Sequence, residues 1–252
     1  MDDLSARPGE PAPLADRLNR HLAAGEFDVG ERIGSERELA ERLGVTRSEL
    51  RSALDVLERD GQVRRTIGRA GGVFRWDGKI ERHLNTIEGV PDMLRQQGFR
   101  PGTAVLSSGI GLASGVEARA LRIAPGDRVF RLRRRRDADD IPLSIDHMVL
   151  PMALLPGFPN VTLTGSVYRT LAEQYGIEAG HANETIDVVA ATADQASILD
   201  IDPGDALLEI RRVTYSTQGV PFEFARDFFC AARTRITLSR HGARWKRAVD
   251  HR

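Results

Sequence analysis

The chain has 252 residues, of which 41% are hydrophobic and 29% charged, and its formal net charge is +0. This composition excludes a disordered chain, the length favours two domains, and the zero net charge means that any basic surface must be local. No apolar run approaches the roughly 20 residues that cross a bilayer, and the first residues do not resemble a secretory signal. The single cysteine, Cys230, fits a reducing compartment. We therefore expect a cytoplasmic protein without membrane contact.

The first expected element is a helix over residues 14–25. Pro13 suits the first turn of a helix, and Leu14, Leu18 and Leu22 recur every four residues. This spacing predicts one apolar stripe that packs on a core, after a loose tail of residues 1–11 and before Gly25.

Two further helices follow, each with its own start signal. Ser35 with Glu38, and Thr46 with Glu49, are capping-box patterns, in which the hydroxyl accepts from an orphan amide and the carboxylate from the cap amide. They predict a helix from Glu36 to Leu43, a tight turn at Gly44, and a third helix that ends near Asp60.

The hairpin that follows completes a known layout. Strands are expected over residues 63–66 and 73–76, separated by Gly68, Gly71 and Gly72. Two helices joined by a tight turn and followed by a glycine-tipped hairpin predict a winged helix-turn-helix, whose second motif helix enters the major groove of DNA.

The third helix carries the residue types that read DNA. Arg47 and Arg51 lie in its first two turns, and an arginine can donate two parallel hydrogen bonds to guanine. Hydroxyls and helix N-termini suit phosphate oxygens, and arginines of the wing can reach the backbone or the minor groove. From the residues alone, the same layout would also serve protein contacts, with the arginines as a solvated face.

The second half contains an internal repeat. A polar stretch, residues 77–86, is expected to be a linker, and a helix is expected over residues 90–97. Beyond them Ala118–Asp127 matches Ala196–Asp205 in length, with Pro-Gly-Asp at the end of both, and each copy leads to a strand, a polar loop and a proline, Pro142 or Pro221. Two copies indicate a duplicated domain, since a solenoid needs about three or more.

A candidate ligand site follows from strand periodicity. In residues 129–136, Phe130 and Leu132 share one face with Arg134 and Arg136, so two guanidinium groups point inward if the apolar pair does. Buried arginines without partners are costly, which leaves a structural salt-bridge network and an anionic ligand as the two interpretations. The candidate partners on other segments are Asp146, Ser166, Tyr168 and Glu223.

The residues Gly30–Gly61 resemble, without gaps, the DNA-binding domain of the GntR superfamily of bacterial regulators. The resemblance implies contacts to operator DNA from Ser35, Arg37, Thr46, Arg47, Ser48, Arg51, Arg65, Gly68 and Arg69. The chain departs from the family pattern at Gly34, where proline is usual, and at Glu49, where a small or hydroxyl residue is common.

Residues from about 87 to 238 resemble the UTRA effector domain of the HutC branch of that superfamily, which has a chorismate-lyase-like fold. The motifs are Arg134-x-Arg136, Pro142-Leu-Ser-Ile-Asp146, Ser166-x-Tyr168 and Pro221-Phe-Glu223. The resemblance implies that Arg134, Arg136, Ser166 and Tyr168 hold an anionic group, whereas Asp146 and Glu223 hold the rest of the effector.

We therefore expect an α+β protein: a winged helix-turn-helix over residues 12–76, a linker over 77–86, and an antiparallel-sheet domain with flanking helices over 87–240. The expected function is a dimeric repressor that binds double-stranded operator DNA and a small, anionic effector, with no cofactor, metal or catalytic residues. Two alternatives remain open: a regulator whose sensor domain has lost its ligand, and a lyase-like enzyme. For the latter only the pair His181 and Glu184 comes into question, and it reads as a surface pair in a strand.

Overall fold

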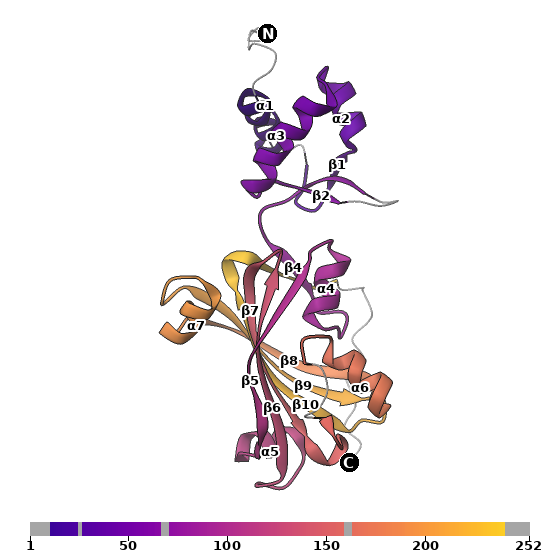
Figure 1. Ribbon diagram of the computed structural model, residues 1–252, viewed down its shortest axis with the longest axis vertical. Helices are drawn as coiled ribbons and strands as arrows, with labels where there is room; N and C mark the ends of the chain where they lie inside the picture. Colours follow the sequence, from indigo (N-terminus) through magenta and orange to yellow (C-terminus); the bar gives the residue numbers. More distant parts are fainter. Residues whose placement is uncertain (1–10, 25–26, 67–70, 159–162, 240–252) are drawn as a thin grey trace, which may run out of the picture. The chain divides into compact units, whose positions relative to one another are not determined.

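The computed structural model describes residues 11–24, 27–66, 71–158 and 163–239. The chain divides into two compact units, Met1–Lys79 and Ile80–Arg252. Within the described residues, no helix is long and apolar enough to cross a membrane. Figure 1 shows the elements of both units.

The first unit consists of helices packed on a small sheet. Its elements are α1 (Pro11–Ala23), β1 (Arg32–Gly34), α2 (Glu36–Leu43), α3 (Arg47–Arg59), β2 (Val63–Thr66) and β3 (Gly72–Arg75). The predicted stripe of Leu14, Leu18 and Leu22 is buried and packs in one cluster with Leu50 and Leu54 of α3. Both predicted capping boxes are present, at Ser35 and at Thr46.

Three local features differ from the sequence prediction. Helix α1 begins at Pro11, within what was expected to be the tail, and ends at Ala23. Strand β1 was not predicted, and it pairs with β3 to give the sheet order β1-β3-β2. It is only three residues long, and its pairing partner lies about forty residues further along the chain, so no local pattern reveals it.

The segment expected to be a linker contains a strand. Strand β4 (Ile80–His83) pairs in parallel with β11 (Thr234–Thr237), near the end of the described chain. Ile80 and Arg82 are buried. The polar sequence predicted a linker because the strand is short and its partner is distant, whereas the structure places residues 80–83 in the second unit.

The second unit is built on a six-stranded antiparallel sheet of order β5-β6-β7-β10-β9-β8. Its elements after β4 are α4 (Val90–Gln96), β5 (Pro101–Leu112), α5 (Gly115–Leu121), β6 (Arg128–Ala138), β7 (Ile141–Pro151), a 3-10 turn (Met152–Leu154), α6 (Val167–Tyr175), β8 (Ala179–Ala190), α7 (Ala193–Leu199), β9 (Ala206–Ser216), β10 (Pro221–Cys230), a second 3-10 turn (Ala231–Arg233) and β11.

The predicted repeat is present as two similar halves of this sheet. Helices α5 and α7 both begin with a capping box and end at a residue with positive φ, Arg122 at 54° and Asp200 at 52°. Each is followed by the Pro-Gly-Asp turn and then by two hairpin strands. The halves β5-β6-β7 and β10-β9-β8 meet where β7 pairs with β10.

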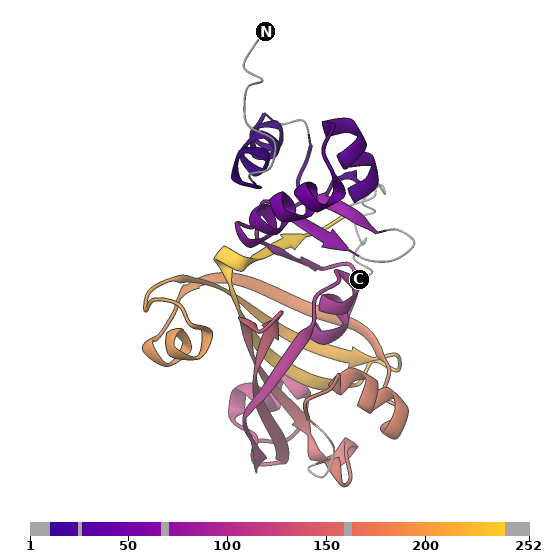
Figure 2. The same cartoon turned by 45° about the horizontal axis from the view of Figure 1, so that its top comes forward.

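The two faces of the sheet carry different helices. Helices α4 and α6 lie on one side and α5 and α7 on the other (Figures 1 and 2). On the α6 side, Phe130 and Leu132 pack with Val167 and Leu171. On the other side, α7 packs on Ile145 and Phe228. Because side chains alternate along a strand, β6 and β7 each present one set of residues to each face.

Candidate functional site

The first candidate site is the start of α3. Gly44, at φ 65°, ends α2 in the left-handed conformation and turns the chain directly into Thr46, the cap of α3. Glycine adopts this conformation without steric cost. The tight turn therefore fixes how the first two turns of α3 project from the unit.

Exposed cationic and hydroxyl groups gather there. Arg47, Ser48 and Arg51 are exposed, as is Arg37 on α2. Arg51 Nε donates to Glu36 Oε2 over 2.7 Å, while Arg37 lies 4.0 Å from Glu41, at the limit of an ion pair. Within the described part of the chain no ion pair is found for Arg47, so its guanidinium is available to a partner.

Ser35 and Thr46, also expected to contact DNA, serve as helix caps. Their hydroxyl oxygens accept from the backbone amides of Glu38 and Glu49, both over 3.2 Å. The Thr46 hydroxyl also donates to Glu49 Oε2 over 2.7 Å. Hydrogen bonds from the Thr46 side chain and backbone lower the pKa of Glu49. The structural role of Glu49 is therefore to cap α3.

Arg65 is engaged within the unit. Its guanidinium is 2.6 Å from Asp55 Oδ1 and 2.7 Å from Glu58 Oε2, both on α3. These bonds fasten strand β2 to α3, and they leave Arg65 less suited to phosphate than sequence alone suggested. Gly68 and Arg69, expected at the tip of the wing, lie outside the described residues.

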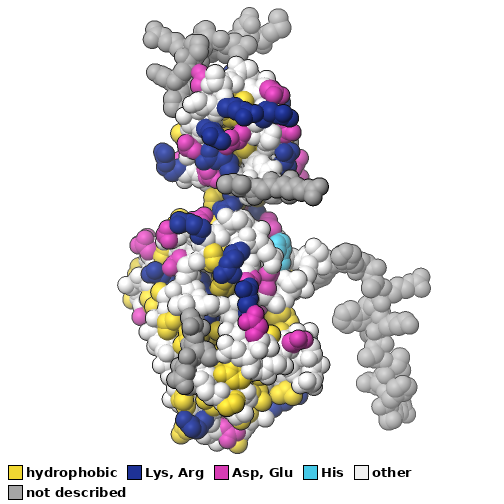
Figure 3. Space-filling model, turned by 45° about the vertical axis from the view of Figure 1, so that its right-hand side comes forward, with side chains coloured by type: hydrophobic (Ala, Val, Ile, Leu, Met, Phe, Trp, Pro, Cys, Tyr) yellow, Lys and Arg dark blue, Asp and Glu magenta, His cyan; other side chains and the backbone are white. Residues whose placement is uncertain are grey.

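The charge around these residues is mixed. Figure 3 shows basic and acidic side chains interspersed on the visible face of the first unit. Acidic side chains also lie beside the candidates for DNA contact, since Glu36 binds Arg51 and Glu41 lies near Arg37.

The second candidate site lies on the α4 and α6 side of the large sheet. Arg134 and Arg136 are buried there, as their strand parity predicts, with 1% and 3% of their surface exposed. Asp146 on β7 binds both. Arg134 donates to its two oxygens over 3.1 and 2.6 Å, and Arg136 Nη2 donates over 3.0 Å. Of the two interpretations left open, a salt bridge is therefore present.

A second cluster of buried hydrogen bonds, centred on Glu223, lies beside this salt bridge. Tyr168 and Thr214 both donate to Glu223 Oε2 over 2.5 Å. Arg212 Nε donates to the same oxygen over 3.2 Å. Burial raises the pKa of Tyr168, so its hydroxyl stays a donor. Burial also disfavours ionised Glu223, but Arg212 outweighs this and lowers the pKa of Glu223.

Five of the six predicted effector residues line one small cavity. They are Arg134, Arg136, Asp146, Ser166 and Tyr168, and Glu223 is joined to them through Tyr168. Ser166 caps α6 and accepts from the amide of Arg169. The cavity volume is about 20 Å³, which holds about one water. A metabolite would fit only if the surrounding segments moved apart.

The structure adds three charged residues that the sequence did not single out, Arg82, Arg212 and Asp227, together with Glu184, which the sequence offered only as a partner of His181. Arg212 occupies the position in the second repeat that Arg134 occupies in the first, and this match is the signal that could have found it. Arg82 is 4% exposed, lines the cavity and binds Glu184 over 3.0 Å. Its Nε is buried without a hydrogen-bond partner among the described residues.

Arginines and acids are equal in number in this buried cluster. Four arginines, Arg82, Arg134, Arg136 and Arg212, face four acids, Asp146, Glu184, Glu223 and Asp227. Burial raises the pKa of Asp227 despite Arg212 nearby, and Asp146 lies opposite it across β7 and β10. Burial therefore disfavours the ionised form of Asp227, so this acid offsets the arginines less than Asp146 and Glu223 do.

The His181 and Glu184 pair does not form a catalytic arrangement. His181 stacks on Tyr215 with ring centroids 4.5 Å apart. Glu184 instead binds Arg82 and Arg212. In the described ranges there is also no group of three His, Cys, Asp or Glu side chains that could hold a metal.

Comparison with known proteins gives both halves a family. Residues 12–73 match the model of the bacterial regulatory proteins of the gntR family, and residues 96–235 match the UTRA domain. The chain is 30% identical over 229 residues, 90% of its length and 92% of the relative, to the "Probable fructoselysine utilization operon transcriptional repressor" of Escherichia coli K12. It is 27% identical to the "HTH-type transcriptional repressor NagR" of Bacillus subtilis over 86% of this chain and 88% of the relative.

A solved structure supports the fold. The crystal structure of PhnF from Mycobacterium smegmatis aligns with a TM-score of 0.65 and 27% identity, over 91% of this chain and 99% of that one.

Proposed function

Since the chain belongs to the GntR family of bacterial regulators and carries a UTRA domain, it is a DNA-binding transcriptional regulator with an effector domain, and we propose that it is a repressor controlled by an anionic metabolite. Repression is supported by the names of its relatives, several of which are called repressors. In this proposal residues 12–76 bind the operator and residues 87–240 bind the effector and dimerise. Residues 77–86 connect them, with residues 80–83 forming strand β4 of the second unit. The protein acts in the cytoplasm, where the operator is.

The anionic character of the effector rests on one observation. The buried cavity is lined by Arg134, Arg136 and Arg82, and Arg82 Nε has no acceptor in the described part of the chain. A buried donor without an acceptor costs about 1–3 kcal/mol. A ligand carboxylate or phosphate would supply the missing acceptor and compete with Asp146 for the other two arginines.

The size of the cavity supplies a physical link between ligand and control. A space of about 20 Å³ does not admit a metabolite, so the effector must bind an arrangement in which α4, α6 and the sheet are further apart. A ligand shifts an equilibrium only as far as it binds two arrangements unequally. The effector cannot enter the closed arrangement, so it binds the two arrangements unequally. A site of this kind acts by binding the effector and does not need to convert it chemically.

Dimerisation, the third part of the proposal, is supported by strand β5. It is an edge strand of twelve residues without one charged side chain, and Leu106, Ile110 and Leu112 on it are exposed. Long, uncharged, apolar edges pair readily with another strand. A two-fold axis would let β5 of one copy pair with β5 of another, and two winged helices would then reach two half-sites.

The experiment that tests the proposal measures binding to the DNA upstream of the protein's own coding region by fluorescence anisotropy. Arg47→Ala should weaken binding about fivefold or more, because a good arginine–base contact is worth about 1–3 kcal/mol. Arg119→Ala, an exposed arginine of α5, serves as the control and should bind as the wild type does. Undiminished binding by Arg47→Ala would show that α3 does not read the operator.

The same assay separates an active sensor from one without a ligand. Sugar phosphates, amino acids and organic acids are first screened by thermal shift, since a ligand at 100 times its Kd stabilises by about 2.7 kcal/mol. Any stabilising compound should also release the DNA. If no anion stabilises the protein while DNA binding is intact, the domain serves only for dimerisation.

A further inference from the structure

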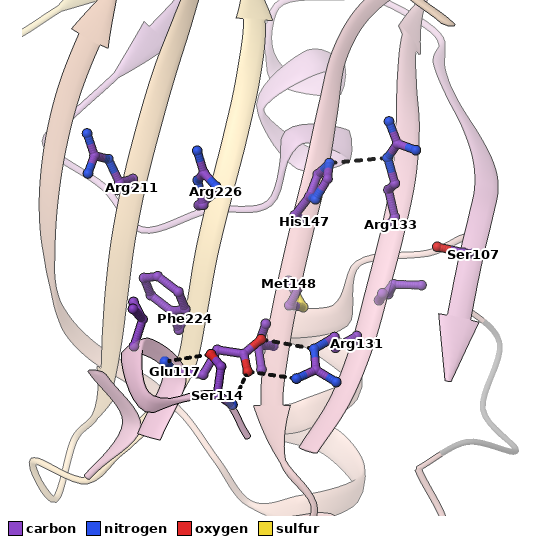
Figure 4. A pocket seen from close by; sticks show the side chains of 13 residues that line it. Ser107, Ser114, Glu117, Arg131, Arg133, His147, Met148, Arg211, Phe224 and Arg226 are labelled. Atoms are coloured by element: carbon purple, nitrogen blue, oxygen red, sulfur yellow. Dashed lines mark hydrogen bonds and ion pairs between the residues drawn. The ribbon is translucent and has the colours of Figure 1, made fainter. Parts of the chain in front are cut away.

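A second and larger pocket lies on the opposite face of the sheet, beside α5. Its volume is about 550 Å³, within the range of roughly 300–1,000 Å³ that small-molecule sites occupy. Strands β6, β7, β9 and β10 form its floor, and α5 closes one end (Figure 4). Nothing in the proposed function uses this pocket.

Four nitrogen-rich side chains form a straight row across its floor. Arg133, His147, Arg226 and Arg211 lie directly opposite one another on neighbouring strands, and Figure 4 shows them side by side. The duplication generates this row: Arg133 matches Arg211 in the two repeats, and His147 matches Arg226. The local symmetry axis therefore passes between His147 and Arg226. Like charges placed opposite each other in a sheet are destabilising, so the stability of this row depends on the acids that pair with its arginines.

The acids that offset the row sit mostly at its ends. Arg133 binds Asp194, which is 67% exposed, and Arg211 binds Asp187, which is 45% exposed. Glu209, which is buried, binds both Arg226, over 2.6 Å, and Arg211, over 3.6 Å. Exposed ion pairs contribute little and are readily exchanged for another anion. Arg133, whose acidic partner is exposed, can thus accept a ligand anion at small cost.

The row offers hydrogen-bond donors toward the pocket. Arg133 Nε donates to His147 Nε2 over 3.2 Å, which assigns the ring proton to Nδ1. Burial, together with Arg133, lowers the pKa of His147 and keeps the ring neutral. Among the described residues no hydrogen bond is found for Nη1 of Arg133, Arg211 or Arg226. These nitrogens, with His147 Nδ1, are complementary to oxygen acceptors.

The end of the pocket beside α5 has apolar side chains and one ion pair. Phe224 and Val149 lie on its floor toward α5, and Val116 on α5 is 56% exposed at its rim. Glu117 and Arg131 bind each other over 2.7 Å at the same end, so their charges are paired off. The pocket therefore has a donor-rich part and an apolar part.

We propose that this pocket binds an amphipathic organic anion, with its carboxylate, phosphate or sulfonate group on Arg133 and His147 and its apolar or aromatic body on Phe224 and Val149. The site is distinct from the proposed effector cavity, yet both are built from the same strands: Arg133 is followed by Arg134, and His147 is preceded by Asp146. Occupancy of one face can therefore bear on the other through shared backbone.

The probe that tests this is anilinonaphthalene sulfonate, an aromatic sulfonate that fluoresces when bound, added to the full-length protein. The wild type should bind it saturably at one site per chain. Arg133→Gln should weaken binding at least tenfold and is a mild change, because its partner Asp194 is exposed. Phe224→Leu should also weaken it. The control is Arg128→Gln, which makes the same charge change on the same strand but outside the pocket, and should leave binding unchanged. Melting temperatures establish that each variant is folded.

A neutral analogue of the probe distinguishes the contribution of the anionic group to binding from that of the apolar body. Phenylnaphthylamine, which lacks the sulfonate, should bind the wild type at least tenfold more weakly and should not respond to Arg133→Gln. Equal binding of both probes, or unchanged sulfonate binding by Arg133→Gln, would overturn the proposal. So would a weakening by Arg136→Gln but not by Arg133→Gln, which would place the probe in the effector cavity. The sulfonate probe could also bind only after the protein is diluted until light scattering shows monomers. That result would show instead that a second copy of the chain covers the pocket.

Discussion

At the level of single residues, the most consequential contact of the second unit is that of Asp146 with two buried arginines. One carboxylate accepts from both Arg134 and Arg136, and neither arginine has appreciable contact with water. A buried pair need not add net stability, but removing one partner leaves an uncompensated charge. Asp146 thus serves two purposes, since it neutralises the pocket and holds the place that an effector anion would take.

Asp146→Asn should lower the free energy of unfolding at pH 7 by about 3–5 kcal/mol, the usual consequence of breaking a buried ion pair. Burial raises the pKa of Asp146, but Arg134 and Arg136 outweigh it and lower that pKa below 3.8. The stabilisation is therefore present above pH about 4 and is lost as the pH falls through the lowered pKa. Urea unfolding followed by circular dichroism at pH 7 and pH 3 measures both effects.

Asp140→Asn provides the comparison for this substitution. Asp140 binds Arg100 on the surface, with 84% and 75% of the two side chains exposed, and such pairs contribute at most about 1 kcal/mol. If Asp146→Asn cost no more than Asp140→Asn, the buried arginines would not depend on this carboxylate.

At the level of elements, the two halves of the large sheet show which parts of a repeat are structural. Helices α5 and α7 begin with the same cap, in which the third helical residue accepts from the backbone amide of the cap. That residue is Glu117 in one half and Gln195 in the other. Only Glu117 also binds an arginine, Arg131. The cap is thus shared, whereas the ion pair belongs to one half.

Glu117→Gln should preserve α5 but remove the ion pair, because Gln195 shows that glutamine makes the cap. We expect a loss of about 1.5 kcal/mol at pH 7, the lower range for hydrogen bonds to charged groups. The hydrogen bond from Arg131 lowers the pKa of Glu117 from 4.5 to about 2. The difference from wild type should therefore vanish as the pH falls from 4.5 to about 2, in thermal unfolding monitored at several pH values.

The reverse substitution in the other half gives a matched check. Gln195→Glu introduces the same carboxylate where no ion pair with arginine is found in the described residues, so it should not produce the same stabilisation. An equal gain there would attribute the effect to the helix terminus rather than to Arg131.

At the level of the whole molecule, the proposed repressor places two winged helices of a dimer on one operator. A single winged helix contacts a half-site, so dimerisation multiplies affinity without any new base contact. The uncharged edge of β5 is the proposed contact, whereas the opposite edge, β8, carries Glu184 and Asp187 and is protected against pairing in the way that natural sheets use charge.

Ile110→Lys should therefore convert the protein to a monomer at micromolar concentration, because a buried lysine opposite its own copy places like charges in contact. Affinity for a full operator should fall at least a hundredfold, while the melting temperature changes little, since Ile110 is 44% exposed. Light scattering and anisotropy measure the two effects. Val220→Lys, an equally exposed apolar residue at the start of another hairpin strand, should leave the dimer intact. A dimeric Ile110→Lys protein would remove β5 from the proposed interface.

The sequence by itself determined those features that depend on neighbours in the chain. Capping pairs three residues apart fixed where α2 and α3 begin, and alternation along β6 placed Arg134 and Arg136 on the buried face. The match of Ala118–Asp127 with Ala196–Asp205 revealed a duplicated sheet. These signals are local because helix and strand periodicity act over a few residues.

Only the tertiary structure decided which distant groups meet. Strand β4 was hidden in an expected linker because its partner, β11, lies at the other end of the domain. Asp146, Arg212 and Arg82 come together from three strands to form the charged cluster, and the row from Arg133 to Arg211 exists only once four strands are in register. Pairing partners far apart in sequence leave no periodic trace, because each is selected by contacts that form on folding.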